Sequence, residues 1–319
     1  MIHRSKFAAL ALSAAALHCI PAMAADELYM TAGAVGSASY LYGVAPGTGA
    51  VDAAHLIVDS GSIFTGATTG LAYGEGELYM TAGGVGSASY LYGIAPGSGA
   101  IGSAHVINDG AVVFTGATTG LAYGQGELYM TAGSVGGASY LYGIDPGTGT
   151  IGSARVISDG TVIFTGATTG LVYGDGALYM TAGGAGSASY LYRIDPATGL
   201  IDSSRLISDS TSFFTGATTG LTYGNGGLYM TAGAVGTASY LYGIDPDTGA
   251  IDSARVITDD GPFTGGITGL AYISAVPEPT ALALFGLGTL LFAARRRRAP
   301  VPQRQPGARQ VDRAHGLAS

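Results

Sequence analysis

A unit of fifty residues is repeated five times between positions 27 and 272 of this 319-residue chain. The segment ELYM begins at Glu27, and copies or near-copies of it begin at positions 77, 127, 177 and 227. A second segment, FTGATTGL, begins at Phe64 and recurs at 114, 164 and 214, and a variant begins at Phe263, one residue early. Repeats of about 20 to 50 residues are typical of solenoids, propellers and other arrays. We therefore expect a single repeat domain over residues 25–275.

Turn-forming residues divide each unit into four short segments rich in β-favouring side chains. In the second copy these segments are Gly70–Tyr73, Glu77–Thr81, Ser89–Ile94 and Ser103–Ile107. Proline and glycine lie between them, where they end strand pairing through a fixed φ angle or a positive one. Four antiparallel strands in about fifty residues match the size of a propeller blade. The sequence therefore predicts an all-β fold of five four-stranded repeats.

The two ends of the repeat region complement each other. The first copy begins with its second strand, Leu28–Thr31, and the last copy ends with a first strand, Gly269–Ile273. If the last strand joins the first three, five complete blades result and no sheet end is left open. We therefore predict a five-bladed β-propeller closed by the C-terminal strand. A β-solenoid, with two coils in each unit, is the alternative.

Charge separates the repeats from the two ends of the chain. Between residues 25 and 276, nineteen acidic side chains face four arginines, which gives this body a net charge of −15. A surface of this sign repels phosphate backbones and anionic bilayers, so nucleic acid is excluded as a partner. The single cysteine, Cys19, falls in a segment that we expect to be removed. The mature protein is therefore expected to have no disulfide.

The first 24 residues have the three parts of a secretory signal peptide. Arg4 and Lys6 supply the basic part, and residues 7–17 form an apolar stretch. The small residues Ala22 and Ala24 follow at the positions that signal peptidases require, so cleavage is expected after Ala24. The alternative is an uncleaved anchor, although the apolar stretch is short for a span.

The C-terminal region combines a proline motif, an apolar run and an arginine cluster. The apolar run covers residues 280–294, which is about 22 Å as a helix against about 30 Å of hydrocarbon. It predicts a marginal transmembrane helix whose arginine flank stays in the cytoplasm. The candidate sorting-signal residues are Val276, Pro277, Glu278, Pro279, Arg295, Arg296, Arg297 and Arg298.

Residues 276–298 resemble the PEP-CTERM sorting signal of Gram-negative bacteria. The resemblance implies an exosortase-like protease of the inner membrane as a partner, and an exported protein linked to exopolysaccharide and biofilm. It also implies transient anchoring in the inner membrane, followed by release to the cell surface or beyond. Such signals end soon after the arginines, whereas here residues 299–319 follow, for which we expect a disordered cytoplasmic tail. An ordinary tail anchor is the alternative.

Repetition argues against an active site, because acid and base catalysis needs groups in different environments. A catalytic site should therefore interrupt the pattern. The interruptions are Phe213, Arg193, the Asp245–Asp247 variant and the shortened turn at 259–262, and none of them places a histidine or a second carboxylate in a recognisable arrangement. We expect no catalytic residue and no cofactor, and a glycan hydrolase is the least favoured function.

The recurring acidic and basic residues suggest structural duties. The aspartates at positions 59, 109, 159, 209 and 259 follow the fourth strand of each copy, where an Asx-type turn explains them better than calcium binding. His55 and His105 are replaced by arginine in the later copies, which favours a charged outer edge strand over a metal pair. No metal site is therefore expected. Thr65, Thr68 and Thr69 are expected at one mouth of the central channel, where their hydroxyls could hold water, an ion or a sugar.

Paired tyrosines are the candidate binding residues. The candidate glycan-binding side chains are Tyr40, Tyr42, Tyr90, Tyr92, Tyr140 and Tyr142. Five weak sites of this kind would combine into useful avidity for extracellular polysaccharide. The interpretation that we favour, however, is that the alternating Tyr-Leu-Tyr pattern packs between sheets as core. The sequence thus predicts an exported structural or interaction protein of the cell surface or matrix, with a multivalent carbohydrate-binding protein as the alternative.

Overall fold

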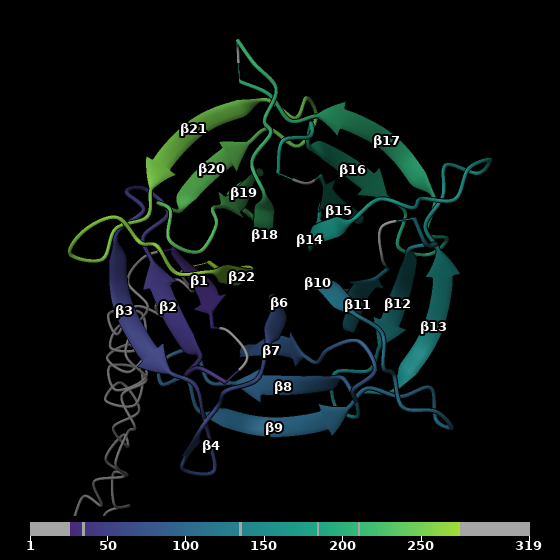
Figure 1. The fold of residues 1–319 in the computed structure, drawn as a ribbon. Helices are drawn as coiled ribbons and strands as arrows, with labels where there is room; N and C mark the ends of the chain where they lie inside the picture. Colours follow the sequence, from purple (N-terminus) through teal and green to yellow (C-terminus); the bar gives the residue numbers. More distant parts are fainter. Residues whose placement is uncertain (1–25, 34–35, 134–135, 184, 210, 275–319) are drawn as a thin grey trace, which may run out of the picture. The chain divides into compact units, whose positions relative to one another are not determined.

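The computed structural model describes residues 26–274 with the exception of 34–35, 134–135, 184 and 210. Within this part of the chain, five four-stranded antiparallel sheets surround a central axis as a five-bladed β-propeller (Figure 1). The predicted fold is confirmed, and the solenoid alternative is wrong. The predicted signal peptide, transmembrane helix and tail, at residues 1–24, 280–294 and 299–319, lie outside the described residues.

We number the blades I to V from the N-terminus, each with its strands in order from the axis to the rim. Blade I consists of β22 (Ile267–Ile273), β1 (Glu27–Ala32), β2 (Tyr40–Val44) and β3 (Val51–Leu56). Blade II consists of β6 (Thr68–Gly74), β7 (Glu77–Ala82), β8 (Tyr90–Ile94) and β9 (Ile101–Val106). Blade III consists of β10 (Thr118–Gly124), β11 (Glu127–Ala132), β12 (Tyr140–Ile144) and β13 (Ile151–Val156).

Blades IV and V repeat this pattern. Blade IV consists of β14 (Thr168–Gly174), β15 (Ala177–Ala182), β16 (Tyr190–Ile194) and β17 (Ile201–Leu206). Blade V consists of β18 (Thr218–Gly224), β19 (Gly227–Ala232), β20 (Tyr240–Ile244) and β21 (Ile251–Val256). A small hairpin of β4 (Val58–Asp59) and β5 (Ser62–Ile63) lies between blades I and II. The innermost and outermost strands begin about two residues before the predicted ones.

Strands from the two ends of the repeat region close the ring. β22 pairs antiparallel with β1 from Glu27 opposite Ile273 to Thr31 opposite Gly269. At the rim, the amide of Val51 donates to the carbonyl of Thr258 over 2.8 Å, which joins blade V to blade I a second time. Parallel bridges at the equivalent place connect each of the four remaining pairs of adjacent blades. Closure by the C-terminal strand is therefore confirmed.

The core lies between the blades. Between blades I and II, fully buried side chains of both sheets meet, among them Leu41, Leu78, Met80 and Ile94. Equivalent residues fill each of the other interfaces, so the apolar pattern of one repeat is used five times. Each blade therefore depends on its neighbours to bury its apolar surface.

Glycine allows the inner strands to approach the axis. A Cβ atom on Gly120 would lie 2.8 Å from the Cβ of Leu171 and 3.0 Å from its backbone nitrogen in the next blade. The equivalent glycines of the other inner strands meet the same contact, at positions 70, 170, 220 and 269. Such distances leave no room for a side chain. A ring of only five blades is therefore tight at its centre.

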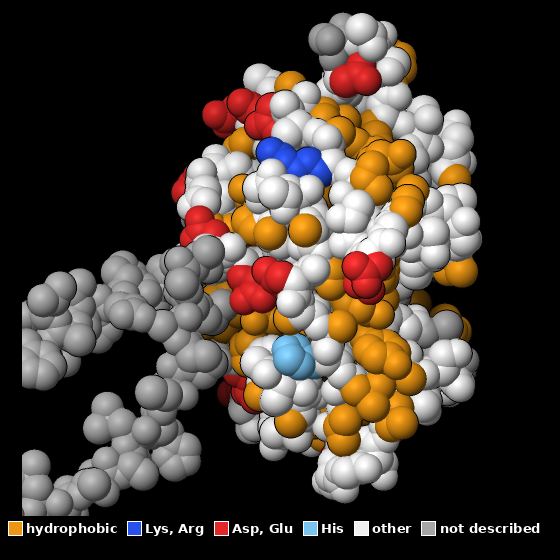
Figure 2. All heavy atoms as spheres, turned by 90° about the vertical axis from the view of Figure 1, so that its left-hand side faces the viewer, with side chains coloured by type: hydrophobic (Ala, Val, Ile, Leu, Met, Phe, Trp, Pro, Cys, Tyr) orange, Lys and Arg blue, Asp and Glu red, His pale blue; other side chains and the backbone are white. Residues whose placement is uncertain are grey.

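The rim carries the basic residues. His55 and its equivalents lie on the outermost strands, as the sequence predicts. Arg205 and Arg255 also donate from Nε to carbonyl oxygens in the next blade, at Asp247 and Gly47, over 2.8 Å each. These arginines therefore place positive charge on the outermost strands and also link adjacent blades. On the side of the rim seen in Figure 2, acidic side chains form several patches, arginine forms a single small patch, and a histidine lies apart from it.

One property bears on membrane attachment. Residues 26–274, apart from the gaps given above, contain no helix that is long and apolar enough to cross a membrane.

Candidate functional site

Paired tyrosines lie at the beginning of the third strand of each blade. In blade I, Tyr40 and Tyr42 point to the same side of β2 because alternate residues of a strand share a face. Leu41 points the opposite way and is fully buried. Tyr42 is half-buried, whereas Tyr40 keeps 37% of its surface exposed. Their ring centroids are 5.8 Å apart, so the two rings form one aromatic platform.

A phenylalanine from the preceding connection completes each platform. Phe263, between β21 and β22, meets the ring of Tyr42 edge-on, with centroids 5.1 Å apart and planes at 75°. This geometry is favourable for aromatic pairs. The same triad recurs at Tyr90, Tyr92 and Phe64, at Tyr140, Tyr142 and Phe114, at Tyr190, Tyr192 and Phe164, and at Tyr240, Tyr242 and Phe214. We call these five sites the tyrosine grooves.

The tyrosine grooves combine core packing with exposure. The inner tyrosine of each pair packs against the core, but the outer one is between 36% and 40% exposed in all five blades. The inner tyrosines therefore have the predicted core role, whereas the outer ones leave more than a third of their surface exposed. The phenylalanines were not recognised as groove residues from the sequence, although their constant place in the FTG landmark is the signal that marks them.

The groove between blades V and I follows a shorter turn than the other four. It opens into a cleft of about 430 Å³ lined by Tyr40, Tyr42, Phe263, Val235 and Asp259, among others. The turn that precedes Phe263 is one residue shorter than its equivalents. The amide of Asp259 donates to the carbonyl of Gly261 over 2.8 Å, which closes this tighter turn.

The recurring aspartates fall into two groups. The Oδ1 atom of Asp109 accepts the backbone amides of Ala111 and Val112 over 3.0 and 2.7 Å. These bonds lower the pKa of Asp109, and Asp159 and Asp209 make the same turn. The predicted Asx turns are confirmed there. They are wrong for Asp59, which accepts the Ser60 hydroxyl, and for Asp259, whose carboxylate accepts no hydrogen bond within the described residues.

Threonine hydroxyls form a chain around the central channel. Thr69 bonds Thr118 of the next blade and, over 3.1 Å, Thr81 of its own blade. Equivalent bonds join three further pairs of blades, but Ile267 interrupts the chain between blades V and I. The channel at this level encloses about 10 Å³, which is at the lower limit for one water molecule. A sugar site within the channel is therefore wrong, and Thr65 is an exposed residue outside it.

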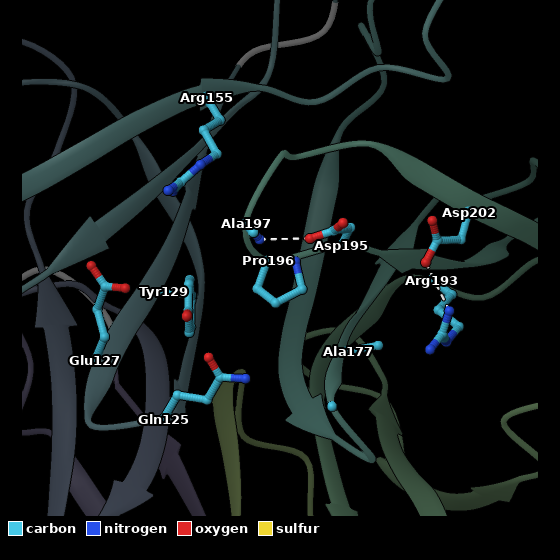
Figure 3. A pocket seen from close by; sticks show the side chains of 11 residues that line it. Gln125, Glu127, Tyr129, Arg155, Ala177, Arg193, Asp195, Pro196, Ala197 and Asp202 are labelled. Carbon is cyan, nitrogen blue, oxygen red and sulfur yellow. Dashed lines mark hydrogen bonds and ion pairs between the residues drawn. The ribbon is translucent and has the colours of Figure 1, made fainter.

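A second cleft, of about 500 Å³, lies between blades III and IV (Figure 3). Glu127 and Tyr129 lie on one side of it, and the turn at Asp195 lies on the other. Four of its five charged side chains form the following ion pair and hydrogen bonds. Arg193 pairs with Asp202 over 2.7 Å, Asp195 accepts the amide of Ala197, and Arg155 donates to Ser153.

This second cleft follows from a paired exchange of residues. In blade I, a Cβ atom on Gly43 would clash with the carboxylate of Glu27, and blades II and III repeat the arrangement. In blade IV, Ala177 replaces the glutamate and Arg193 replaces the glycine. The long side chain therefore comes from β16 in this blade and not from β15. This exchange explains why Arg193 interrupts the repeat: its side chain takes the space that the glutamate fills in the first three blades. Within the described residues, no three histidine, cysteine, aspartate or glutamate side chains are grouped to hold a metal ion.

A family model provides the clearest link to known proteins. Residues 275–298 match the PEP-CTERM protein-sorting motif, which confirms the resemblance that the sequence suggests. The motif implies that the protein is exported and sorted by an exosortase, a membrane protease, and that its C-terminal region anchors it transiently in the membrane. The repeats lie outside the match.

Comparison with solved structures yields low similarity throughout. Glutaminyl cyclase of Myxococcus xanthus is 16% identical, with a TM-score of 0.44, over 70% of this chain and 75% of that one. A chain of the nidogen/laminin complex is 12% identical, with a TM-score of 0.46, over 79% and 98%. Apo AztD of Citrobacter koseri is 11% identical, with a TM-score of 0.36, over 79% and 99%. The search of curated proteins returned no match.

Proposed function

We propose that the protein is a non-catalytic polysaccharide-binding component of the cell surface or extracellular matrix, and that its five tyrosine grooves bind the polymer. The observation that carries this proposal is the exposure of the outer tyrosine in all five blades. A residue needed only for packing would be buried. Aromatic side chains with an apolar ring and a polar hydroxyl suit sugar rings, which are apolar on one face and carry hydroxyls at the edge.

Repetition supports a polymeric ligand. Five similar grooves around one ring can hold successive parts of a chain or several chains at once, so weak individual affinities combine. An exopolysaccharide offers the same unit many times. The link to exopolysaccharide and biofilm, which the sorting motif suggests, is consistent with this arrangement.

The absence of catalysis is part of the proposal. The largest interruption of the repeat, at Ala177 and Arg193, is a packing exchange, and the charged groups around it are engaged in turns and an ion pair. An active site needs groups that are free to exchange protons or hold a substrate. The tyrosine grooves present rings and hydroxyls, which suit binding.

Binding is tested by changing the five outer tyrosines together. Replacing Tyr40 and its equivalents at 90, 140, 190 and 240 by alanine should lower the avidity for the exopolysaccharide of the producing strain by at least about 100-fold, because every groove loses half of its platform. The matched control replaces the same five by phenylalanine, which keeps the rings and should retain most binding. Affinity electrophoresis measures both, with thermal melting as the folding check. Unchanged retention of the alanine variant would refute polysaccharide binding at the grooves.

Sorting is tested separately. We propose that the signal peptide and the C-terminal signal are removed and that the mature protein reaches the surface or the medium. Replacing Pro277-Glu278-Pro279 by alanine should trap an uncut precursor in the inner membrane, because the extended peptide next to the bilayer is lost. Mass spectrometry of the secreted fraction provides the measurement. Mature parent protein that retains Arg295–Arg298 would show that no processing occurs.

A further inference from the structure

We infer that the V–I groove is the principal binding site of the ring and that it selects a sugar unit carrying a protonated amino group. This inference rests on the proposed polysaccharide binding and names the ligand class at one of its grooves. Three observations carry it: the cleft, the carboxylate of Asp259, which lies beside the aromatic platform and accepts no hydrogen bond from the residues that the structure describes, and the charge of the body.

The first observation is the shape of the groove. The shortened turn before Phe263 leaves a cleft of about 430 Å³ over the rings of Tyr40 and Tyr42. Only 8% of the surface of Phe263 is exposed, whereas the equivalent phenylalanines in the other grooves are more exposed. Val235, which is 79% exposed, forms another part of the wall. This groove therefore encloses a ligand more than a flat platform would.

The second observation is the state of the carboxylate. Asp109, Asp159 and Asp209 use their side chains to cap their own turns, and Asp59 accepts the hydroxyl of Ser60. The carboxylate of Asp259 makes no such bond within the described residues and lines the cleft. It lies near enough to Tyr42 to help raise the pKa of that hydroxyl, after the larger effects of burial and of Tyr40.

The third observation concerns the ligand's charge. A free carboxylate next to aromatic rings attracts a cation twice, through its own charge and through the faces of the rings. The net charge of −15 on residues 25–276 opposes any acidic polymer and favours a cationic one. A hexosamine with a free amino group matches both the platform and the carboxylate, whereas a uronic acid would place two like charges together.

Binding by the full exported protein tests the inference. The probe is a glucosamine hexamer, compared with its N-acetylated counterpart and with an oligogalacturonate, by calorimetry at low salt and at a mildly acidic pH. We expect one strong site for the glucosamine hexamer, at least about tenfold weaker binding of the acetylated one, and no binding of the acidic one.

Asp259→Asn should weaken binding of the glucosamine hexamer at least about tenfold and leave thermal melting unchanged, because this carboxylate holds no turn. Asp260→Asn is the matched control. It removes the same charge from the next residue of the turn, and asparagine tolerates its φ of 49°. That variant should bind within about twofold of the parent.

Two results would overturn the inference. Asp259→Asn with parental affinity would show that the carboxylate takes no part, and equal binding of the amino and acetylated hexamers would remove the charge preference. Either result leaves the proposed function standing if binding of neutral polymers is still weakened by replacing the five outer tyrosines with alanine. If neither Asp259 nor the five outer tyrosines affects binding, polysaccharide binding itself is refuted.

Discussion

The interface between blades V and I differs from the four others, although all five use the same core residues. The four regular interfaces are each crossed by a threonine bond at the axis and follow a turn of constant length. At V–I, Ile267 replaces the threonine, the turn is shorter, and Asp259 lines the cleft with a carboxylate that accepts no hydrogen bond from any described residue. One side of this interface is blade I, which is built from both ends of the repeat region.

The difference separates what the fold requires from what it tolerates. Glycine at the axis and the buried Leu, Met and Ile side chains are present at all five interfaces, so the ring depends on them. The threonine link is absent at one interface without loss of closure. Features that vary at V–I are therefore those that can take on a chemical role.

The strongest test of the comparison removes β22, the innermost strand of blade I, which packs against blade V through Leu270 and against blade II through Ala271 and Ile273. Deleting residues 269–273 exposes one side of β1 and removes the buried side chains of Leu270, Ala271 and Ile273. The loss of apolar burial alone is roughly 5 kcal/mol, a large share of the stability of an ordinary domain. We expect cooperative urea unfolding to be lost or its midpoint to fall sharply.

A replacement serves as the control for this deletion. Inserting the blade II segment Gly70–Gly74 at the deleted place supplies nearly the same sequence and should restore most of the stability. A deletion variant that melts like the parent would mean that β22 does not hold the ring together.

A smaller effect is expected at the axis of a regular interface. Gly120→Ala places a Cβ atom within 3.0 Å of backbone in blade IV, where the strands cannot move apart without opening the ring. Overpacking of this kind costs about 1 to 3 kcal/mol. Gly97→Ala, where nothing lies within 4 Å, is the control and should change the free energy of unfolding little. Gly220→Ala, whose Cβ atom would lie 2.8 Å from the Cβ of Leu270, should match Gly120→Ala if the V–I axis is as tight, and urea unfolding compares all three.

Much of this architecture is predictable from the sequence because it depends on repetition. The period, the turn residues and the complementary ends at Leu28 and Gly269 define the number of blades and their closure. The tyrosine pairs were also identified as candidates. The state of Asp259 was not predictable, because it depends on which backbone amides a shortened turn presents. The exchange between Ala177 and Arg193 was also missed, because it joins residues on adjacent strands whose register the sequence does not show.

A third test converts a regular interface into a copy of V–I. Thr118→Ile removes the bond to Thr69 but adds apolar burial, as Ile267 does at 5% exposure. A lost hydrogen bond costs about 1 kcal/mol, so the net loss of unfolding free energy should be at most about that. Thr118→Ala, which loses the bond and gains no burial, should cost more. An isoleucine variant that loses several times as much would show that the V–I axis has space that the regular interfaces lack.

The smallest expected effect on stability concerns a hydrogen bond between blades at the opposite end of the inner strands. Measuring it tests whether the interfaces differ at that end as well. Tyr123 donates to Glu75 of the preceding blade over 2.8 Å, and burial together with this bond raises its pKa to about 12. In the unfolded chain a tyrosine ionises near pH 10, so this contribution is complete below about pH 10 and is lost as the pH rises towards about 12. The hydrogen bond itself is exposed to solvent, so solvent reduces the effect.

Tyr123→Phe should therefore lower stability slightly at pH 8, and the gap to the parent should narrow by pH 11. Tyr73→Phe is the control, because the Tyr73 hydroxyl makes no hydrogen bond to another described residue. Urea unfolding at the two pH values gives the comparison. A gap that stays constant would mean that the bond between Tyr123 and Glu75 does not contribute, and that the interfaces are alike at this end of the ring.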